Sequence, residues 1–208
     1  MSETAARPMS RRREQTRTRL LDAAHEIFGE VGMDGASVEV ICERAGFTRG
    51  AFYSNFESKE ELFLALVSRM AEAKMDEVAG RVRGLSPDAG LAPAALVRQV
   101  IGVSLGEHLE PQLVSEIRTQ ALRDPRMAAA YLAWQERMRR RVEVIIATVV
   151  ESHGMRLRLS VAEAAQLLLV TSIEASMAAA IEGRNRRESG ELLAERLEKF
   201  VTLLVDVS

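Results

Sequence analysis

Apolar residues recur with helical spacing from Val38 to Phe56, and this pattern predicts two short helices joined by a tight turn. In the first helix, apolar residues stand at i, i+3, i+4 and i+7, which places them on one buried stripe. These residues are Val38, Ile41, Cys42 and Ala45. Ser37 carries a hydroxyl suited to cap this helix, and Gly46 can take the left-handed conformation that ends it. Two helices with such a turn form a helix-turn-helix, whose second helix enters the major groove of DNA.

The second helix of the pair has an inner and an outer side. Thr48 can cap it, and Phe52 and Phe56 lie four residues apart on the inner side. The outer side carries Arg49, Gly50, Tyr53 and Asn55. A glycine within a helix costs about 1 kcal/mol relative to alanine. Two interpretations of Gly50 stand: the helix tolerates it, or the missing side chain lets the backbone approach a phosphate closely.

A further helix is predicted directly after this pair. Ser58 and Glu61 have the spacing of a capping box, in which each side chain satisfies a backbone N–H at the start of the helix. Lys59 occupies the first helical position, where a positive charge is unfavourable unless an anion lies nearby. A DNA phosphate would meet that need, and we expect Lys59 to contact one.

Helical patterns continue along the rest of the chain, and no stretch predicts a strand or an internal repeat. Besides the pair above, the expected helices span about residues 14–31, 59–82, 96–109, 111–122, 125–153, 161–182 and 191–205. The sequence therefore predicts an all-α fold of about nine helices. The first three form an N-terminal helix-turn-helix domain, and a larger helical domain follows.

From about Arg13 to Leu66 the sequence resembles the DNA-binding domain of the TetR family of bacterial transcription regulators, of the TetR/AcrR type. The resemblance is carried by the run Leu21-Asp-Ala-Ala-His-Glu-Ile-Phe-Gly-Glu-Val-Gly32, by Ala45-Gly-Phe-Thr48, by Gly50-Ala-Phe-Tyr53 with Phe56, and by Ser58-Lys-Glu-Glu-Leu-Phe63. Asn55 departs from the pattern, because the family often carries histidine there. The candidate DNA contacts are Arg17, Ser37, Thr48, Arg49, Gly50, Ala51, Tyr53, Asn55 and Lys59.

The resemblance also implies a domain organisation and an assembly. We expect a disordered basic arm at 1–12, the helix-turn-helix domain at 13–58, a connecting helix at 59–83, and a ligand-binding and dimerisation domain at 84–208. Family members dimerise through their last two helices, here 161–182 and 191–205. Small residues that suit close helix approach are Ala164, Ala165, Ala175, Ala178 and Ala179. A twofold dimer places two recognition helices on half-sites about 34–36 Å apart, so the expected partner is a palindromic double-stranded DNA operator. The alternative is that both helices are covered within one chain.

A small-molecule pocket among the middle helices, roughly between Leu96 and Ile181, is a further implication of the resemblance. The candidate pocket residues are Trp134, Met70, His108, Glu116, Gln120, Met127, Met138 and Met177. An unidentified effector would shift the helix at 59–82, spread the recognition helices and release the operator. The expected function is a ligand-released repressor. The alternative keeps the fold but lacks a small-molecule inducer, so that the protein is controlled by a protein partner or acts as an activator.

The net charge of −2 does not by itself indicate a nucleic-acid-binding protein, because it is slightly negative. Residues 1–19, however, hold six arginines and two glutamates, a surplus of four positive charges. This arm could reach the phosphate backbone or a minor groove, or it could be a solubilising tail.

Composition excludes several other classes. The three histidines are scattered without metal-ligand spacing, and the chain has neither a Gly-rich phosphate loop nor a nucleophile elbow, so we expect no enzyme, no metal and no cofactor. No apolar run approaches the ~20 residues of a membrane helix, and the start of the chain has no signal-peptide core, so we expect a cytoplasmic protein without a membrane partner. The single cysteine, Cys42, is expected in the core.

Overall fold

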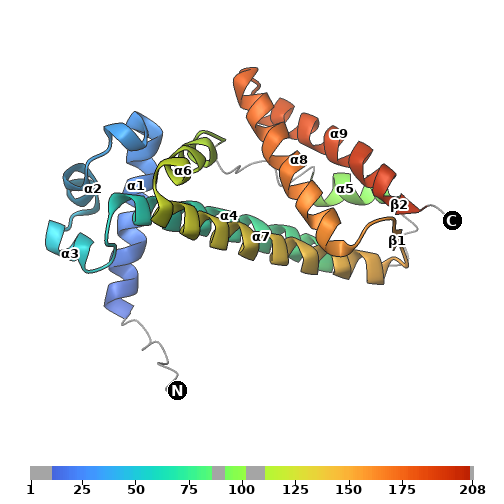
Figure 1. Cartoon of the computed structure of the whole chain (residues 1–208), viewed down its shortest axis with the longest axis horizontal. Helices are drawn as coiled ribbons and strands as arrows, with labels where there is room; N and C mark the ends of the chain where they lie inside the picture. The colour runs from blue at the N-terminus through green and yellow to red at the C-terminus, as the bar shows by residue number, and fades with distance from the viewer. Residues whose placement is uncertain (1–10, 86–91, 102–110, 207–208) are drawn as a thin grey trace. The chain divides into compact units, whose positions relative to one another are not determined.

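The computed structural model describes residues 11–85, 92–101 and 111–206. These residues form nine α-helices and one two-stranded antiparallel ladder, which confirms the predicted all-α fold (Figure 1). The elements are α1 (Arg11–Gly35), α2 (Val38–Ala45), α3 (Arg49–Tyr53), α4 (Lys59–Arg83), α5 (Pro93–Ile101), α6 (Pro111–Arg123), α7 (Pro125–Ser152), β1 (Arg156–Leu157), α8 (Val161–Ile181), α9 (Arg186–Leu204) and β2 (Val205–Asp206). The chain divides into two compact units, residues 1–67 and 68–208, and the division falls inside α4.

The first unit is held together by phenylalanine rings. Phe52, Phe56 and Phe63 are almost completely buried. The Phe28 and Phe63 rings meet edge to face with centroids 5.1 Å apart, which joins α1 to the start of α4. Cys42 is 3% exposed, so the expected core position is confirmed, and burial raises the pKa of its thiol.

Helix α1 differs from its prediction at both ends. It begins at Arg11, so the last two residues of the arm expected to be disordered, Arg11 and Arg12, are helical. At the other end, the predicted stop at Gly32 is a kink. Gly32 has φ 71° and ψ 174°, a conformation that favours glycine, and helical residues continue beyond it to Gly35.

The second unit packs its helices through small side chains. Helix α8 contacts both α7 and α9, and α8 and α9 lie side by side in Figure 1. Four alanines of α8 are buried within this single chain: Ala164, Ala165, Ala175 and Ala179. Contacts inside one chain therefore account for most of the small residues that the sequence analysis assigned to a dimer.

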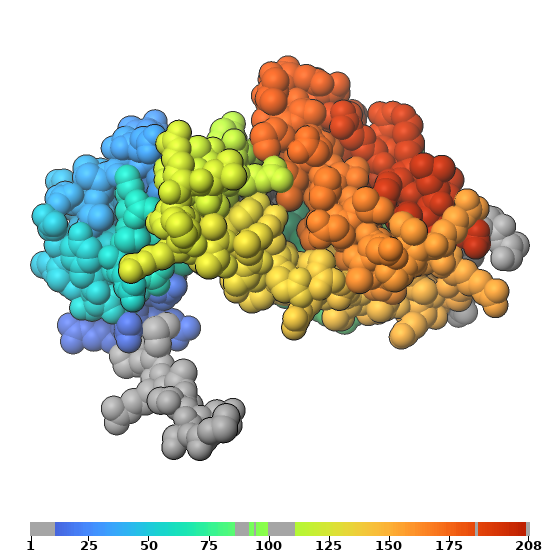
Figure 2. Space-filling view, in the orientation of Figure 1, coloured from blue at the N-terminus to red at the C-terminus, as the bar shows by residue number. Residues whose placement is uncertain are grey.

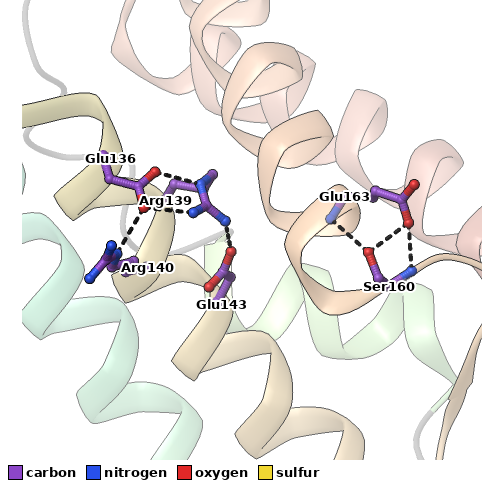
Figure 3. A network of polar contacts seen from close by, with 6 residues as sticks. All are labelled: Glu136, Arg139, Arg140, Glu143, Ser160 and Glu163. Atoms are coloured by element: carbon purple, nitrogen blue, oxygen red, sulfur yellow. Dashed lines mark hydrogen bonds and ion pairs between the residues drawn. The ribbon is translucent and has the colours of Figure 1, made fainter. Parts of the chain in front are cut away.

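Two short features of the second unit escaped prediction. The expectation of no strand is wrong, because β1 pairs with β2 in a two-residue ladder that is supported by an ion pair from Arg158 Nε to Asp206 Oδ1 at 2.7 Å. Helix α9 begins at Arg186, five residues earlier than expected, because Asn185 and Glu188 form a capping box. Ser160 and Glu163 form a second capping box, at the start of α8 (Figure 3).

Candidate nucleic-acid interface and ligand cavity

Backbone caps fix the turn between α2 and α3. The Ser37 hydroxyl accepts a hydrogen bond from the Val40 N–H at 3.2 Å, and the Thr48 hydroxyl accepts one from the Ala51 N–H at 3.3 Å. Gly46 ends α2 in the left-handed conformation, at φ 70° and ψ 37°. Ser37 and Thr48, both candidate DNA contacts, thus serve first as helix caps that set the direction of the two helices.

The outer side of α3 presents an exposed arginine and an exposed tyrosine. The Arg49 side chain is 61% exposed and Tyr53 is 51% exposed, with the guanidinium carbon 5.9 Å from the ring centroid. A hydrogen bond to Tyr53 and the charge of Glu39 raise the pKa of Arg49. The Arg49 Nη1 lies 2.7 Å from Glu39 Oε1. An exposed ion pair of this kind contributes little stability, so Arg49 can exchange Glu39 for another anion or for a base edge.

No contact among the described residues requires glycine at position 50. A Cβ at Gly50 would meet only the Thr48 Oγ1, at an ordinary contact distance of 3.7 Å. Gly50 is exposed, and its neighbour Ala51 is half-buried. The backbone at the start of α3 is therefore open to close approach from outside.

Three arginines of α1 reach backbone carbonyls near the C-terminal ends of α2 and α3. Arg13 Nη2 donates to the Ser54 carbonyl at 2.9 Å, Arg17 Nη1 to the Asn55 carbonyl at 3.0 Å, and Arg19 Nη2 to the Ala45 carbonyl at 2.9 Å. Carbonyls at helix C-termini lack intrahelical partners and attract cations, so these contacts satisfy the helix ends.

Arg17, a candidate DNA contact, is the most buried of these three arginines. Its guanidinium carbon lies 4.2 Å from the centroid of the Phe56 ring, and burial lowers the pKa of Arg17. The side chain thus ties α1 to the end of the helix-turn-helix. Only its remaining N–H groups are available for the predicted phosphate contact, which stays a prediction.

The Asn55 side chain is directed into the chain. Its Nδ2 donates to the Ala51 carbonyl at 2.8 Å. Its Oδ1 is buried and has no hydrogen-bond partner among the described residues. The predicted DNA contact of this side chain would require it to leave the Ala51 carbonyl.

Lys59 also has partners within the chain. Its Nζ donates to the Met33 carbonyl at 2.8 Å and to the Ala36 carbonyl at 2.9 Å, which joins α4 to the segment after the α1 kink. The lysine at the first position of α4 therefore needs no external anion. The neighbouring capping box is modified, because the Glu61 carboxylate accepts from the Glu57 N–H at 2.6 Å while Ser58 accepts from the Glu61 N–H at 3.1 Å.

Lys59→Met should lower the free energy of unfolding by about 2 kcal/mol, since two hydrogen bonds from a charged donor are lost and two carbonyls lose their partner. Urea denaturation followed by circular dichroism measures this change. Arg123→Met is the control, because Arg123 is exposed on α6 and lies in the other unit. Equal stability of the two variants would show that the Lys59 ammonium does not hold these carbonyls. A salt dependence of DNA binding that is flatter by about one unit in Lys59→Met would add a phosphate contact to this internal role.

The second unit contains a cavity of about 570 Å³. It is lined by side chains of α4, α5, α6, α7, α8 and α9, most of them aliphatic. Figure 2 shows a hollow in the surface between the yellow-green atoms of α6 and α7 and the orange atoms of α8. Of the eight candidate ligand contacts, three line the cavity: Trp134, Met138 and Met177. Four others do not line it, namely Met70, Glu116, Gln120 and Met127, and His108 lies outside the described residues.

One edge of the cavity carries a network of charges on α7 (Figure 3). Arg139 donates to both carboxylate oxygens of Glu136, at 2.9 and 2.7 Å, and also pairs with Glu143. Arg140 Nε donates to Glu136 Oε1 at 2.8 Å. Hydrogen bonds from Arg139 and then from Arg140 lower the pKa of the Glu136 carboxyl to about 2. Glu136 and Arg139 are therefore both charged and neutralise one another.

Helix α8 has an apolar outer stripe. Leu167 and Ile181 are 40% and 81% exposed and do not line the cavity. Contrary to the expectation from the sequence, α8 is by length and composition long and apolar enough to cross a membrane, with a mean hydropathy of 1.6 over its most apolar 18-residue window. The outer side of the neighbouring α9 is mainly charged, with exposed Arg187–Glu191 and Lys199–Glu195 pairs.

Residues 20–66 match the sequence model of the family described as bacterial regulatory proteins, tetR family. The chain is 31% identical over 114 residues to the HTH-type transcriptional regulator UidR of Escherichia coli K12, a match that covers 55% of this chain and 56% of that protein. The chain thus aligns with just over half the length of this relative.

Solved structures resemble the fold over most of the chain. A putative TetR-family transcriptional regulator from Mesorhizobium loti is 24% identical, with a TM-score of 0.70, and the match covers 94% of this chain and 99% of that one. A putative transcriptional regulator from Saccharomonospora viridis, solved in complex with choline, is 18% identical, with a TM-score of 0.65 and coverage of 93% and 100%. At these identities the likeness concerns the fold.

Proposed function

We propose that this chain, whose residues 20–66 match the model of the tetR family of bacterial regulatory proteins, is a cytoplasmic, sequence-specific DNA-binding repressor of that family. In this proposal it binds a palindromic operator as a homodimer and is released by a small molecule. The proposal is carried by the outer side of α3, where Arg49 and Tyr53 are exposed next to Gly50.

The face of α3 has the chemistry that DNA recognition requires. An arginine can donate two hydrogen bonds to guanine O6 and N7 in the major groove, and a tyrosine hydroxyl can bond a phosphate. The open backbone at Gly50 allows the start of α3 to approach the sugar-phosphate chain. The α1 arginines that hold the ends of α2 and α3 would keep this face in a fixed orientation.

The outer stripe of α8 supports the homodimer. Leu167 and Ile181 leave apolar surface exposed that a second copy would remove from water. The charged outer side of α9 suits the polar rim of such an interface.

Helix α4 supports the release mechanism, because it carries both a residue bonded to the DNA-binding unit and residues that line the cavity. It begins at Lys59, which is bonded to the end of α1, and its later residues Ala71, Met75 and Val78 line the cavity. A ligand that binds one position of α4 more tightly than another would shift the population of DNA-competent molecules. The choline complex of a protein with this fold supports a small-molecule effector.

Arg49→Ala should weaken operator binding by about 1–3 kcal/mol and relax the preference at one base pair, as expected if Arg49 reads a guanine. Binding titrations against operators substituted at each position measure both effects. Arg123→Ala is the control, because this arginine of α6 is exposed and lies in the other unit. An equal loss on every sequence would assign Arg49 to a phosphate.

Selection of binding sites from random duplex DNA, with the enriched pool rebound at two salt concentrations, tests the proposal as a whole. An enriched palindrome with a steep salt dependence is the expected result. A folded protein that enriches no sequence would contradict it. A thermal-shift screen then separates ligand release from control by a protein partner or from activation, because only a ligand-gated protein is stabilised by a compound that also releases the operator.

A further inference from the structure

The wall of the cavity is apolar because six helices direct aliphatic side chains towards it. Helix α7 contributes Met138, Val142, Ile145 and Val149 at spacings of three and four residues, and α9 contributes Leu193 and Leu197. A cavity of about 570 Å³ with such walls lies in the range that encloses most of the surface of a small ligand. The body of a ligand that fills it must therefore be apolar.

Two strong hydrogen-bond donors of this wall, the Trp134 indole N–H and the Arg118 guanidinium, have no side-chain partner within the described residues. Trp134 is only 4% exposed, and its Nε1 has no hydrogen-bond partner among the described residues. A buried donor that stays unsatisfied costs free energy, so an acceptor in the cavity would be favoured at this point. Arg118 is half-buried and lines the cavity, and within the described part of the chain it makes no ion pair.

The two donors lie on neighbouring helices, near the connection that joins these helices. Arg118 lies six residues before Asp124 on α6, and Trp134 lies ten residues after it on α7. Helices α6 and α7 are connected through Asp124 and contact one another. Both donors are consequently within about three helical turns of the same connection.

The other charged groups of the wall are already paired. Lys74 Nζ lies 3.2 Å from Glu77, and Arg139 is held by Glu136 and Glu143. Glu136, the only carboxylate among the described lining residues, is bonded to two arginines. Arg118 is thus the one lining cation without a counter-charge in the described part of the chain.

We propose that the cavity binds an amphipathic carboxylate, with its apolar body between α4, α7, α8 and α9 and its carboxylate oxygens accepting from Arg118 and the Trp134 indole N–H. This inference deepens the proposed function, because it names the chemical class of the effector. A cation with the same apolar body is disfavoured, since it would place its charge beside Arg118 and satisfy neither donor.

The test compares three probes that share one hydrocarbon chain: decanoate, decanol and decyltrimethylammonium. Trp134 is the only tryptophan of the chain, so its fluorescence reports on the cavity directly, and calorimetry gives the affinities. Decanoate should shift the Trp134 emission and bind about tenfold or more tightly than decanol, and the cation should bind weakest. Palmitate is included as a longer carboxylate.

Two variants locate the head group. Arg118→Gln should weaken decanoate about tenfold to a hundredfold and leave decanol unchanged. Trp134→Phe keeps most of the apolar surface and should weaken decanoate about tenfold by calorimetry. Arg123→Gln is the matched control, because Arg123 lies on the same helix, is exposed and does not line the cavity; it should leave all three affinities unchanged.

Several outcomes would overturn the inference: decanol or the cation binding as tightly as decanoate, neither carboxylate binding at all, or Arg118→Gln weakening decanoate and decanol equally. All of these measurements are made without DNA, so they fail or succeed independently of the repressor proposal. If decanoate binds through Arg118 but does not release the operator, the ligand class stands and ligand-released repression fails. If the operator binds and no carboxylate does, the reverse holds.

Discussion

Leu167→Arg should convert the proposed homodimer into a monomer and weaken operator binding by about a hundredfold or more, because binding to two half-sites from one assembly gains that much over binding to one. Leu167 lies on the outer stripe of α8, is 40% exposed and does not line the cavity. In a twofold interface the substitution occurs twice on the same surface. Two unpaired arginines buried there cost several kcal/mol.

Sedimentation equilibrium measures the oligomeric state of this variant, and operator titration at fixed salt measures its affinity. Leu122→Arg provides the control, because Leu122 is 90% exposed on α6 and outside the α8 stripe, so the same added charge should change neither quantity. A Leu167→Arg protein that stays dimeric would move the interface away from α8. A monomer with undiminished affinity would show instead that the operator is read by single chains.

The local features of the helix-turn-helix could be predicted because they depend on residues close in sequence. The stripe of Ile41, Cys42 and Ala45 is buried as its spacing predicts, and Phe52 and Phe56 face inward. The caps at Ser37 and Thr48 act over three residues. Periodicity and capping depend on residues close in sequence, so both can be predicted without knowledge of the fold.

The partners of the long cationic side chains could not be predicted in the same way. Lys59 bonds carbonyls 26 and 23 residues away, and Arg17 bonds one 38 residues away. Basic residues near a helix-turn-helix favour a DNA interpretation, yet backbone carbonyls at helix ends compete for the same donors. Only the packed structure shows which acceptor each side chain has.

The sequence predicts the aromatic residue of the cavity wall but not its cation Arg118. Trp134, the single tryptophan of the chain, is a predicted pocket residue and lines the wall. Arg118 is absent from the predicted pocket residues, because an arginine on a helix is usually solvated. Only the structure shows that Arg118 shares a helix face with Val114, one turn earlier, and that both line the cavity. The methionines divide for the same reason, since Met138 and Met177 face the cavity and the buried Met127 does not.

Phe52→Ala should lower the free energy of unfolding of the first unit by about 3–5 kcal/mol, the usual cost of a phenylalanine deletion in a packed core. Phe52 is completely buried, and its ring contacts those of Tyr53 and Phe56, with centroids 5.3 and 5.8 Å away. Domains have about 5–15 kcal/mol of stability in total, so the substitution leaves a marginal unit. The exposed face of Arg49 and Tyr53 loses its support, and operator affinity falls with the folded fraction.

Hydrogen exchange of the α2 and α3 amides locates this loss, while Trp134 fluorescence reports separately on the second unit, where that residue lies. Phe52→Leu is the matched variant, because it keeps an apolar side chain of similar size and should cost less than about 1.5 kcal/mol. Saturating operator should restore protection to the alanine variant, because a ligand that binds only the folded state stabilises it by mass action. Full protection together with lost operator binding would instead mean that Phe52 acts on DNA recognition by some route other than holding α3 in place.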